Sequence, residues 1–303
     1  MMVTFIGEEK NTYRLITPWH TFNQAFENRK GEIGFPVRAI CEIAGKEGTG
    51  KSTFAYCLAA AIANEVKDGR IAFADIEEHF DMRFTLTVLE NAGFAGAFHI
   101  VPGKTDGEKT DRLIELLKQE EFPVGILDSV GAISPVAEME GSAEDANWGR
   151  RAKLVNAYMR RIIHTFQFKK TPSILLYTNH IHPRMDGFGF VTPGGVSKDF
   201  LTTAQLRLKK KEKLEDGSFL IEGKVAKNTF GFGQRVFFLF NLAGWGIHPG
   251  LTAVYDCLLL GLAKKERVVK LGDQSFGYMK DLIDGAEDLE MFEPFIKALN
   301  EYK

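Results

Sequence analysis

The sequence has few cysteines and no long apolar run, and both absences narrow the kind of protein it can be. Its 303 residues are 45% hydrophobic, but no stretch of about 18 consecutive apolar residues occurs, so no membrane span is expected. The N-terminus lacks a basic flank before a long apolar stretch, so it does not read as a signal peptide. Cys41, Cys57 and Cys257 are widely spaced among apolar neighbours, which predicts buried, reduced thiols rather than metal ligands or disulfides. We therefore expect a cytoplasmic protein with no membrane partner.

The chain also has little net charge, so any binding to nucleic acid must come from a local patch. Its formal net charge of −2 gives no overall attraction to a polyanion. One long segment, residues 146–185, contains no acidic residue. Its basic side chains are Arg150, Arg151, Lys153, Arg160, Arg161, Lys169, Lys170 and Arg184. Such a one-signed segment predicts a charged face, which is either a solvated helix surface or a site for a polyanion.

What the sequence does contain is a phosphate-binding loop. The pattern G-x-x-x-x-G-K-[ST] is matched by Gly45, Lys46, Glu47, Gly48, Thr49, Gly50, Lys51 and Ser52, with Thr53 after it. Glycines let the backbone N–H groups converge on phosphate oxygens, the lysine reaches the β- and γ-phosphates, and the hydroxyl ligates Mg²⁺. The context agrees with this interpretation, because residues 38–43 are typical of a buried strand and a helix is predicted to run from the loop towards a stop at Gly69.

Acidic residues follow two further predicted strands. Residues 71–75 form one strand, and its end carries the carboxylates Asp75, Glu77, Glu78 and Asp81. Residues 124–128 form another, which ends in Asp128. In open α/β sheets, ligands bind beyond the carboxyl ends of the strands. The first cluster is therefore either a solvated turn or the source of a group that activates a water, while Asp128 has the position of an aspartate that holds the Mg²⁺ shell.

The rest of the chain predicts another buried strand, a flexible loop and an antiparallel region. Residues 173–179 form an apolar strand that leads to His180. Met185, Phe188 and Phe190 lie on a Gly/Pro-rich loop, so they either contact a ligand or fold back onto the domain. Residues 203–209, 218–227 and 234–242 alternate with period two and predict antiparallel strands, with the charged run 209–217 as a hairpin tip. Helices are expected near residues 251–262 and 284–300.

Together these elements predict an α/β fold with a mostly parallel central sheet, flanked by helices and extended by antiparallel strands. We expect an N-terminal segment at residues 1–20, a core at residues 21–280 and a short C-terminal helical segment at residues 281–303. Residues 3–6 are β-like, and they form either an oligomerisation strand or a plain N-terminal strand.

The motifs and their order resemble those of the RecA recombinase family, in particular its compact phage-type or plasmid-type members. The resemblance covers about residues 14–280, and it is carried by residues 45–53, 75–81, 127–141, 179–200 and 224–228. It implies a RecA-like P-loop ATPase core. The same resemblance implies ATP and Mg²⁺ as cofactors.

Carried over position by position, the resemblance implies roles at the nucleotide. Glu77 would activate the attacking water, and Ser52 and Asp128 would organise Mg²⁺. Asp81 and Phe84 match positions that contact adenine. The remaining catalytic assignments are Lys51, His180 and Lys227.

For Lys227 and His180 the resemblance implies roles that extend beyond a single nucleotide site. Lys227 matches a lysine that reaches the γ-phosphate from the next subunit, so the nucleotide would lie between protomers. His180 stands where bacterial members carry a glutamine, and it could report ATP to the DNA site. Thr229 replaces a second interface lysine.

The resemblance also implies two DNA loops. Trp148 and Gly149 fall in the first, and Met185 and Phe188 lie in the second, where an apolar side chain enters between bases. A basic track combined with apolar side chains is what single-strand binders without sequence preference use. The full predicted DNA-binding set is Trp148, Gly149, Arg150, Arg151, Lys153, Arg160, Arg184, Met185, Phe188, Gly194 and Gly195.

The leading hypothesis is an ATP-dependent homologous recombinase, a DNA-dependent ATPase that forms a helical filament on single-stranded DNA and exchanges strands with a homologous duplex. One alternative is a hexameric, helicase-like DNA motor that forms a ring on the same core. Another is a recombination mediator that binds ATP with little turnover, although the intact Glu77 and Asp128 argue against it.

Overall fold

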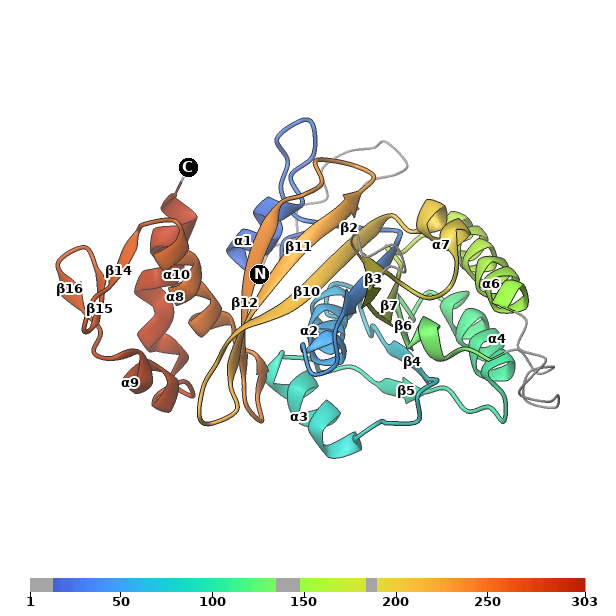
Figure 1. Ribbon diagram of the computed structural model, residues 1–303, viewed down its shortest axis with the longest axis horizontal. Helices are drawn as coiled ribbons and strands as arrows, with labels where there is room; N and C mark the ends of the chain where they lie inside the picture. The colour runs from blue at the N-terminus through green and yellow to red at the C-terminus, as the bar shows by residue number, and fades with distance from the viewer. Residues whose placement is uncertain (1–12, 135–147, 184–189, 303) are drawn as a thin grey trace.

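The computed structural model of the chain describes residues 13–134, 148–183 and 190–302 (Figure 1). Its largest sheet has nine strands in the order β13-β12-β11-β10-β3-β7-β6-β4-β5. The parallel strands are β10 (Ala204–Lys213), β3 (Ala39–Gly45), β7 (Ile174–His180), β6 (Val124–Asp128), β4 (Ile71–Asp75) and β5 (Phe98–Ile100). Antiparallel pairing then adds β11 (Phe219–Asn228), β12 (Val236–Leu242) and β13 (Gly246–Ile247). The predicted fold class is confirmed.

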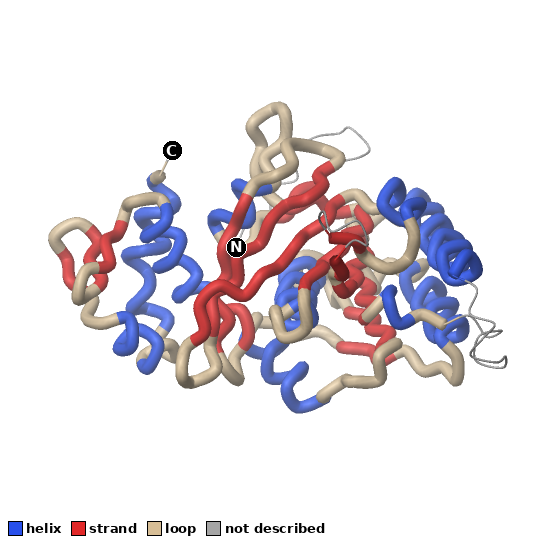
Figure 2. The backbone as a smooth tube through the Cα atoms, viewed as in Figure 1, coloured by secondary structure: helices blue, strands red, loops and turns tan. Residues whose placement is uncertain are grey.

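Helices cover both faces of the parallel strands (Figures 1 and 2). The period of two sends Cys41 and Ile43 of β3 to one face and Ile40 to the other. The first face packs against α1 (His20–Ala25), α2 (Lys51–Ala63) and α3 (Met82–Asn91). The second packs against α4 (Asp106–Leu117) and α6 (Trp148–Phe168). Burial on both sides explains why these strands read as nearly continuous apolar runs.

A third hydrophobic cluster lies beyond the antiparallel strands, at the left of Figure 1. It is built on Leu220 of β11 and Phe240 of β12. The elements that surround it are α8 (Pro249–Leu259), β14 (Ala263–Lys265), β15 (Val269–Leu271), β16 (Gln274–Ser275), α9 (Met279–Asp284), η3 (Leu289–Phe292) and α10 (Glu293–Glu301). The predicted C-terminal segment therefore shares its core with α8.

A buried carboxylate fastens this third cluster to the rest of the chain. Asp256 on α8 accepts hydrogen bonds from the backbone N–H of Thr21 (3.1 Å) and from its hydroxyl (2.7 Å). Burial raises the pKa of Asp256 to about 7, although the hydrogen bonds from Thr21 oppose the shift. The three cysteines are free and buried as expected, and burial raises the pKa of Cys257 to about 12.

Several predicted boundaries are wrong. The helix expected near residues 284–300 begins only at Glu293, after the short 3₁₀ turn η3. The helix after the phosphate loop ends at Ala63 rather than near Gly69. A Cβ at Gly69 would lie 2.1 Å from the carbonyl oxygen of Ala63, so this glycine serves a tight turn after the helix. The charged run at 209–217 is not mainly a hairpin tip, because β10 continues to Lys213. Cross-strand contacts extend it: Lys210 Nζ lies 4.0 Å from the ring centroid of Phe219, and Lys211 Nζ lies 2.9 Å from Glu222 Oε2.

Smaller elements complete the core. β1 (Tyr13–Leu15) pairs with β2 (Phe35–Val37), and β8 (His182–Pro183) pairs with β9 (Phe190–Val191). The 3₁₀ turn η1 (Val130–Ala132) follows β6, and α7 (Val196–Leu201) precedes β10. The predicted strand at residues 3–6 lies outside the described residues. In the described ranges, no helix has the length and apolar character to cross a membrane.

Candidate nucleotide-binding site

The carboxyl ends of the parallel strands bring the predicted nucleotide groups to one edge of the sheet. β3 enters the phosphate loop at Gly45, which is in register with His180 of β7. Asp75 of β4 is likewise in register with Asp128 of β6. A hydrogen bond of 2.6 Å from Ser52 Oγ to Asp128 Oδ2 joins the start of α2 to β6. The edge therefore assembles a phosphate loop, an aspartate and a histidine around one point.

The phosphate loop has the backbone geometry of an anion site. Gly48 and Gly50 have φ of 66° and 81°, in the left-handed region that favours glycine. A Cβ at Gly45 would lie 2.6 Å from Thr49 Oγ1 and 2.8 Å from Leu208 O, so only glycine fits between the loop and β10. Helix α2 begins at Lys51 with no side-chain cap, which leaves its first N–H groups to bind an anion.

Lys51 supplies a buried positive charge beside these N–H groups. Its residue is only 9% exposed, and Nζ donates to the carbonyl oxygen of Lys46 at 3.1 Å. Burial lowers the pKa of Lys51, although the charges of Asp128, Glu77 and Glu47 oppose the shift. A desolvated ammonium at an uncapped helix N-terminus fits the triphosphate that the sequence predicts.

Asp128 and Ser52 fit the predicted Mg²⁺. Thr178 Oγ1 donates to Asp128 Oδ1, opposite the hydrogen bond from Ser52. Burial raises the pKa of Asp128 and the Glu77 charge adds to the shift, although the hydrogen bonds from Ser52 and Thr178 and the Lys51 charge oppose it. A divalent cation nearby would further stabilise the charged carboxylate. Over the described ranges no group of three or more His, Cys, Asp and Glu side chains is arranged as a metal site. Mg²⁺ would take its other ligands from phosphate oxygens and water, as is usual for this ion.

The structure separates the acidic cluster that follows β4. Glu77 alone turns towards Asp128: its Oε1 accepts a hydrogen bond from Ser129 Oγ and lies 3.2 Å from His180 Nε2. The Glu77 side chain is 24% exposed and that of His180 is 35% exposed, so both remain open to water. This is the arrangement required of a carboxylate that orients or deprotonates a water.

The other three carboxylates have structural partners. Asp75 accepts from the backbone N–H groups of Glu78 (2.9 Å) and Phe80 (3.1 Å), and so shapes the turn. Glu78 pairs with Lys109 Nζ at 3.0 Å. Asp81 caps α3 by accepting from the N–H of Phe84 at 3.0 Å. Phe84 is 38% exposed on the first turn of α3, and the contact of Asp81 and Phe84 with adenine stays a prediction.

The predicted DNA-binding residues lie on α6 and around the second loop. Gly149, Arg150, Lys153 and Arg160 are exposed on α6. Arg151 is half-buried, with Nη1 3.4 Å from the carbonyl oxygen of Gly131. Arg184, Met185, Phe188 and the side chain of Trp148 lie outside the described part of the structure.

One member of the basic segment does not belong to an exposed face. Lys169 is 4% exposed, and its Nζ donates to the carbonyl oxygens of Gln119 and Phe122, both at 2.8 Å. Arg161 pairs with Asp111 of α4. The charged face is therefore formed nearer the start of α6. Lys169 instead ties the segment after α6 to the loop before β6, at the amino ends of the strands.

Gly194 and Gly195 bring the exit of the second loop against α6 and α7. Their φ values are 100° and 82°. A Cβ on Gly194 would lie 2.8 Å from Lys198 Cδ, and one on Gly195 would lie 2.8 Å from Ala152 Cβ. Gly195 at the exit of the second predicted DNA loop therefore lies close to Ala152 of α6, the helix that carries most of the predicted basic residues.

The side chain of Lys227 is held by a contact with α7. Its Nζ donates to the carbonyl oxygen of Asp199 at 2.5 Å, and burial lowers its pKa while the charge of Asp199 opposes the shift. Its predicted role towards a nucleotide on a neighbouring subunit stays a prediction.

Sequence reasoning missed several polar partners of the site. Ser129 and Thr178 hold Glu77 and Asp128, and their only signal was that each lies near the carboxyl end of a strand that leads into the site. Glu42 was also missed, although a carboxylate within the apolar run of β3 marks a buried charge. Lys198, which pairs with Glu42 at 2.9 Å, gave no such signal.

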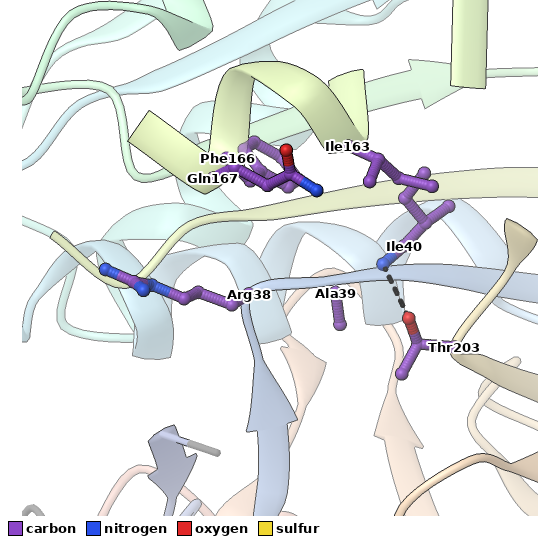
Figure 3. A pocket seen from close by; sticks show the side chains of 7 residues that line it. All are labelled: Arg38, Ala39, Ile40, Ile163, Phe166, Gln167 and Thr203. Atoms are coloured by element: carbon purple, nitrogen blue, oxygen red, sulfur yellow. Dashed lines mark hydrogen bonds between the residues drawn. The ribbon is translucent and has the colours of Figure 1, made fainter. Parts of the chain in front are cut away.

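A cavity of about 460 Å³ lies away from this site, at the amino ends of the strands (Figure 3). Ala39 and Ile40 at the start of β3 line it, together with Thr203, whose Oγ1 lies 3.4 Å from the N of Ile40. Ile163, Phe166 and Gln167 of α6 close its other side. Since the phosphate loop follows the opposite end of β3, this cavity is not the nucleotide site.

A phosphate loop joins β3 to a helix, and an aspartate ends β6, which is separated from β3 only by β7. This arrangement defines a P-loop protein with a RecA-like core. Residues 3–230 match the RecA N-terminal domain family, and the chain belongs to the RecA family.

Similar proteins support this assignment, and the matches cover most of this chain. The plasmid protein RecA of Lactococcus lactis subsp. lactis is 26% identical over 240 residues, covering 77% of this chain and 67% of the relative. Protein RecA of Mycoplasma pneumoniae is 29% identical over 284 residues, covering 90% and 80%. Protein RecA of Lactobacillus acidophilus is 27% identical over 296 residues, covering 95% and 77%.

Proposed function

We propose that this protein is an ATP-dependent homologous recombinase that forms a helical filament on single-stranded DNA and exchanges strands with a homologous duplex. The main support is the position of His180. On one side its ring lies 3.2 Å from Glu77, and on the other the chain leads directly through β8 to the second predicted DNA loop. His180 thereby contacts the carboxylate that would meet the attacking water and precedes in the chain the segment that would meet DNA.

The side chains at the sheet edge divide the work of hydrolysis. Bound ATP with Mg²⁺ supplies the phosphoryl group that is transferred to water. Lys51 and the first N–H groups of α2 offset the negative charge of the phosphates, and Ser52 with Asp128 would hold the metal. Glu77 accepts the proton of the water, because Ser129 and His180 fix the orientation of its Oε1.

DNA binding would depend on local charge, because the chain as a whole is nearly neutral. The exposed Arg150, Lys153 and Arg160 offer a track for phosphates along α6. Affinity should therefore fall steeply with salt concentration. Base pairing rather than the protein would read the sequence.

The experiment is a titration of a fluorescent single-stranded oligonucleotide in the absence of nucleotide, with ADP and with a slowly hydrolysed ATP analogue, followed by negative-stain imaging. We expect the analogue to tighten binding, helical filaments to form, and DNA to stimulate ATP turnover. A strand-exchange assay then compares homologous with heterologous duplex. Closed rings would favour a helicase-like motor, and small complexes with little turnover would favour a mediator. If the protein fails to bind the oligonucleotide both with and without nucleotide, the proposal is ruled out.

A further inference from the structure

A carboxylate is buried in the middle of β3, among apolar neighbours. Glu42 has no exposed surface. Its Oε1 accepts from Lys198 Nζ at 2.9 Å and from Asn179 Nδ2 at 3.0 Å, and its Oε2 accepts from Arg207 Nη1 at 2.8 Å. Burial by itself would raise the pKa of Glu42, but the charges and hydrogen bonds of Lys198 and Arg207 outweigh it and lower the pKa. Glu42 is thus a charged anchor shared by β7, α7 and β10.

Two partners of this anchor also hold the exit of the second loop. Lys198 is completely buried, and its Nζ donates to Thr192 Oγ1 at 2.8 Å and to Asp199 Oδ1 at 2.7 Å as well as to Glu42. Asn179 Nδ2 donates to the carbonyl oxygen of Pro193 at 3.0 Å. Residues 192 and 193 follow β9 directly, so the first residues after the second predicted DNA loop are hydrogen-bonded to partners of Glu42.

The same anchor reaches the nucleotide site without a gap. The backbone N–H of His180 donates to Asn179 Oδ1 at 3.1 Å, and His180 Nε2 lies 3.2 Å from Glu77 Oε1. A continuous series of polar contacts therefore runs from Glu77 through His180, Asn179 and Glu42. It continues through Lys198 to the loop exit.

Such a series is poorly explained by stability alone. Buried ion pairs add little net stability over apolar side chains of similar size, but removing one partner leaves a charge unpaired and costs far more. A displacement of Asn179 would break its bond to Glu42 or its bond to Pro193, and an unpaired buried polar group is costly. A movement of His180 that displaced Asn179 would therefore also act on the loop exit.

We propose that Lys198 is a positioning residue that, through Glu42 and Asn179, couples the loop exit at residues 192–195 to the nucleotide site at His180. This coupling rests on the proposed function, because it requires that both nucleotide and single-stranded DNA bind. Lys198 itself touches neither ligand. Replacing Lys198 should therefore weaken the effect of bound nucleotide on the affinity for single-stranded DNA.

The experiment measures a ratio, namely the Kd for a single-stranded oligonucleotide without nucleotide divided by the Kd with a slowly hydrolysed ATP analogue. Coupling between two sites typically gives a ratio of roughly 5–150. In Lys198→Met, and in the charge-neutral double variant Glu42→Gln with Lys198→Met, we expect the ratio to fall towards one while the Kd for the analogue alone is kept. Thr192→Val removes only the contact between the loop exit and Lys198, so its ratio should fall part of the way.

Lys169→Met is the matched control. It also removes a buried lysine that donates to two acceptors, but those acceptors, Gln119 O and Phe122 O, lie at the opposite end of the sheet. Its ratio should equal that of the wild type, whatever its melting temperature. A wild-type ratio retained in both Lys198→Met and Thr192→Val would overturn the coupling alone. A ratio of one in the wild type itself would overturn the proposed function, and the coupling with it. If Lys198→Met fails to fold, Thr192→Val decides by itself.

Discussion

Charged side chains lie at both ends of the parallel strands, but the two ends differ in how many hydrogen-bond partners the chain supplies to them. At the amino ends, Lys169 donates to two carbonyl oxygens at 2.8 Å, and Glu120 accepts from the N–H groups of Lys170 (3.0 Å) and Thr171 (2.9 Å). At the carboxyl ends, Lys51 Nζ donates to a carbonyl at 3.1 Å, and α2 begins without a side-chain cap.

This difference separates groups that hold the fold from groups that are kept for a ligand. Where the chain supplies several partners, as for Lys169 and Glu120, the charged group fixes neighbouring loops to the sheet and has little capacity left to bind a ligand. Where it supplies only one hydrogen-bond acceptor, as for Lys51, an anionic ligand that binds there further offsets the energetic cost of burial. Substitutions at the carboxyl ends should therefore change function with little loss of stability, and those at the amino ends should do the reverse.

The largest expected effect is on turnover. Glu77→Gln should keep the binding of ATP and DNA but slow hydrolysis by about 10²–10⁴-fold, the usual contribution of a general base. The steady-state ATPase rate on single-stranded DNA measures it. Glu78→Gln is the control one residue away, because Glu78 pairs with Lys109 at 3.0 Å and should be dispensable for hydrolysis. Hydrolysis by Glu77→Gln at the parental rate would contradict the role assigned to Glu77.

The next largest effect is on nucleotide affinity. Hydrogen bonds to charged groups contribute about 1.5–3 kcal/mol each, so losing those of Lys51 in Lys51→Met should weaken ATP binding by about 100-fold or more. The melting temperature without nucleotide should stay the same or rise, since a buried ammonium is removed. Titration with a fluorescent ATP analogue and a thermal melt measure the two quantities.

Lys169→Met completes this comparison from the other end of the sheet. It leaves Gln119 O and Phe122 O without their donor, and each unpaired buried acceptor costs about 1–3 kcal/mol. We expect a lower melting temperature with unchanged ATP affinity. If both lysine variants lost affinity and stability together, the two ends of the sheet would not differ in the way described.

The sequence was a good guide to the carboxyl ends because their chemistry depends on local patterns. The phosphate loop needs glycine at fixed spacing, and Asp128 is the last residue of an apolar strand, so both can be read from neighbours in the chain. The boundaries of β4 and β6 agree with the expected residues 71–75 and 124–128 for the same reason. Parallel pairing then places these strand ends together.

What the sequence could not give are contacts between residues that are far apart in the chain. Glu42 and Lys198 are separated by 156 positions, and only the pairing of β3 with β10 brings α7 to the anchor. Lys169 likewise looked like one member of a basic face, since its partners Gln119 and Phe122 lie in another part of the chain. The sequence also did not distinguish the roles of the four carboxylates at and after the end of β4. They lie within a few residues of one another and differ in which group each side chain contacts.

The smallest expected effect is at the amino ends and depends on pH. Burial would raise the pKa of Glu120, but hydrogen bonds from the N–H groups of Lys170 and Thr171 and from the Thr171 hydroxyl outweigh it and lower the pKa. A carboxylate with a lowered pKa stabilises the fold fully above its unfolded value of 4.5, and this stability is lost as the pH falls through the folded value. Because Glu120 is exposed, Glu120→Gln should cost only about 1 kcal/mol or less at pH 7. The gap in melting temperature between the variant and the wild type should narrow below pH 4.5, whereas a gap that widened there would show that Glu120 is not held by these bonds.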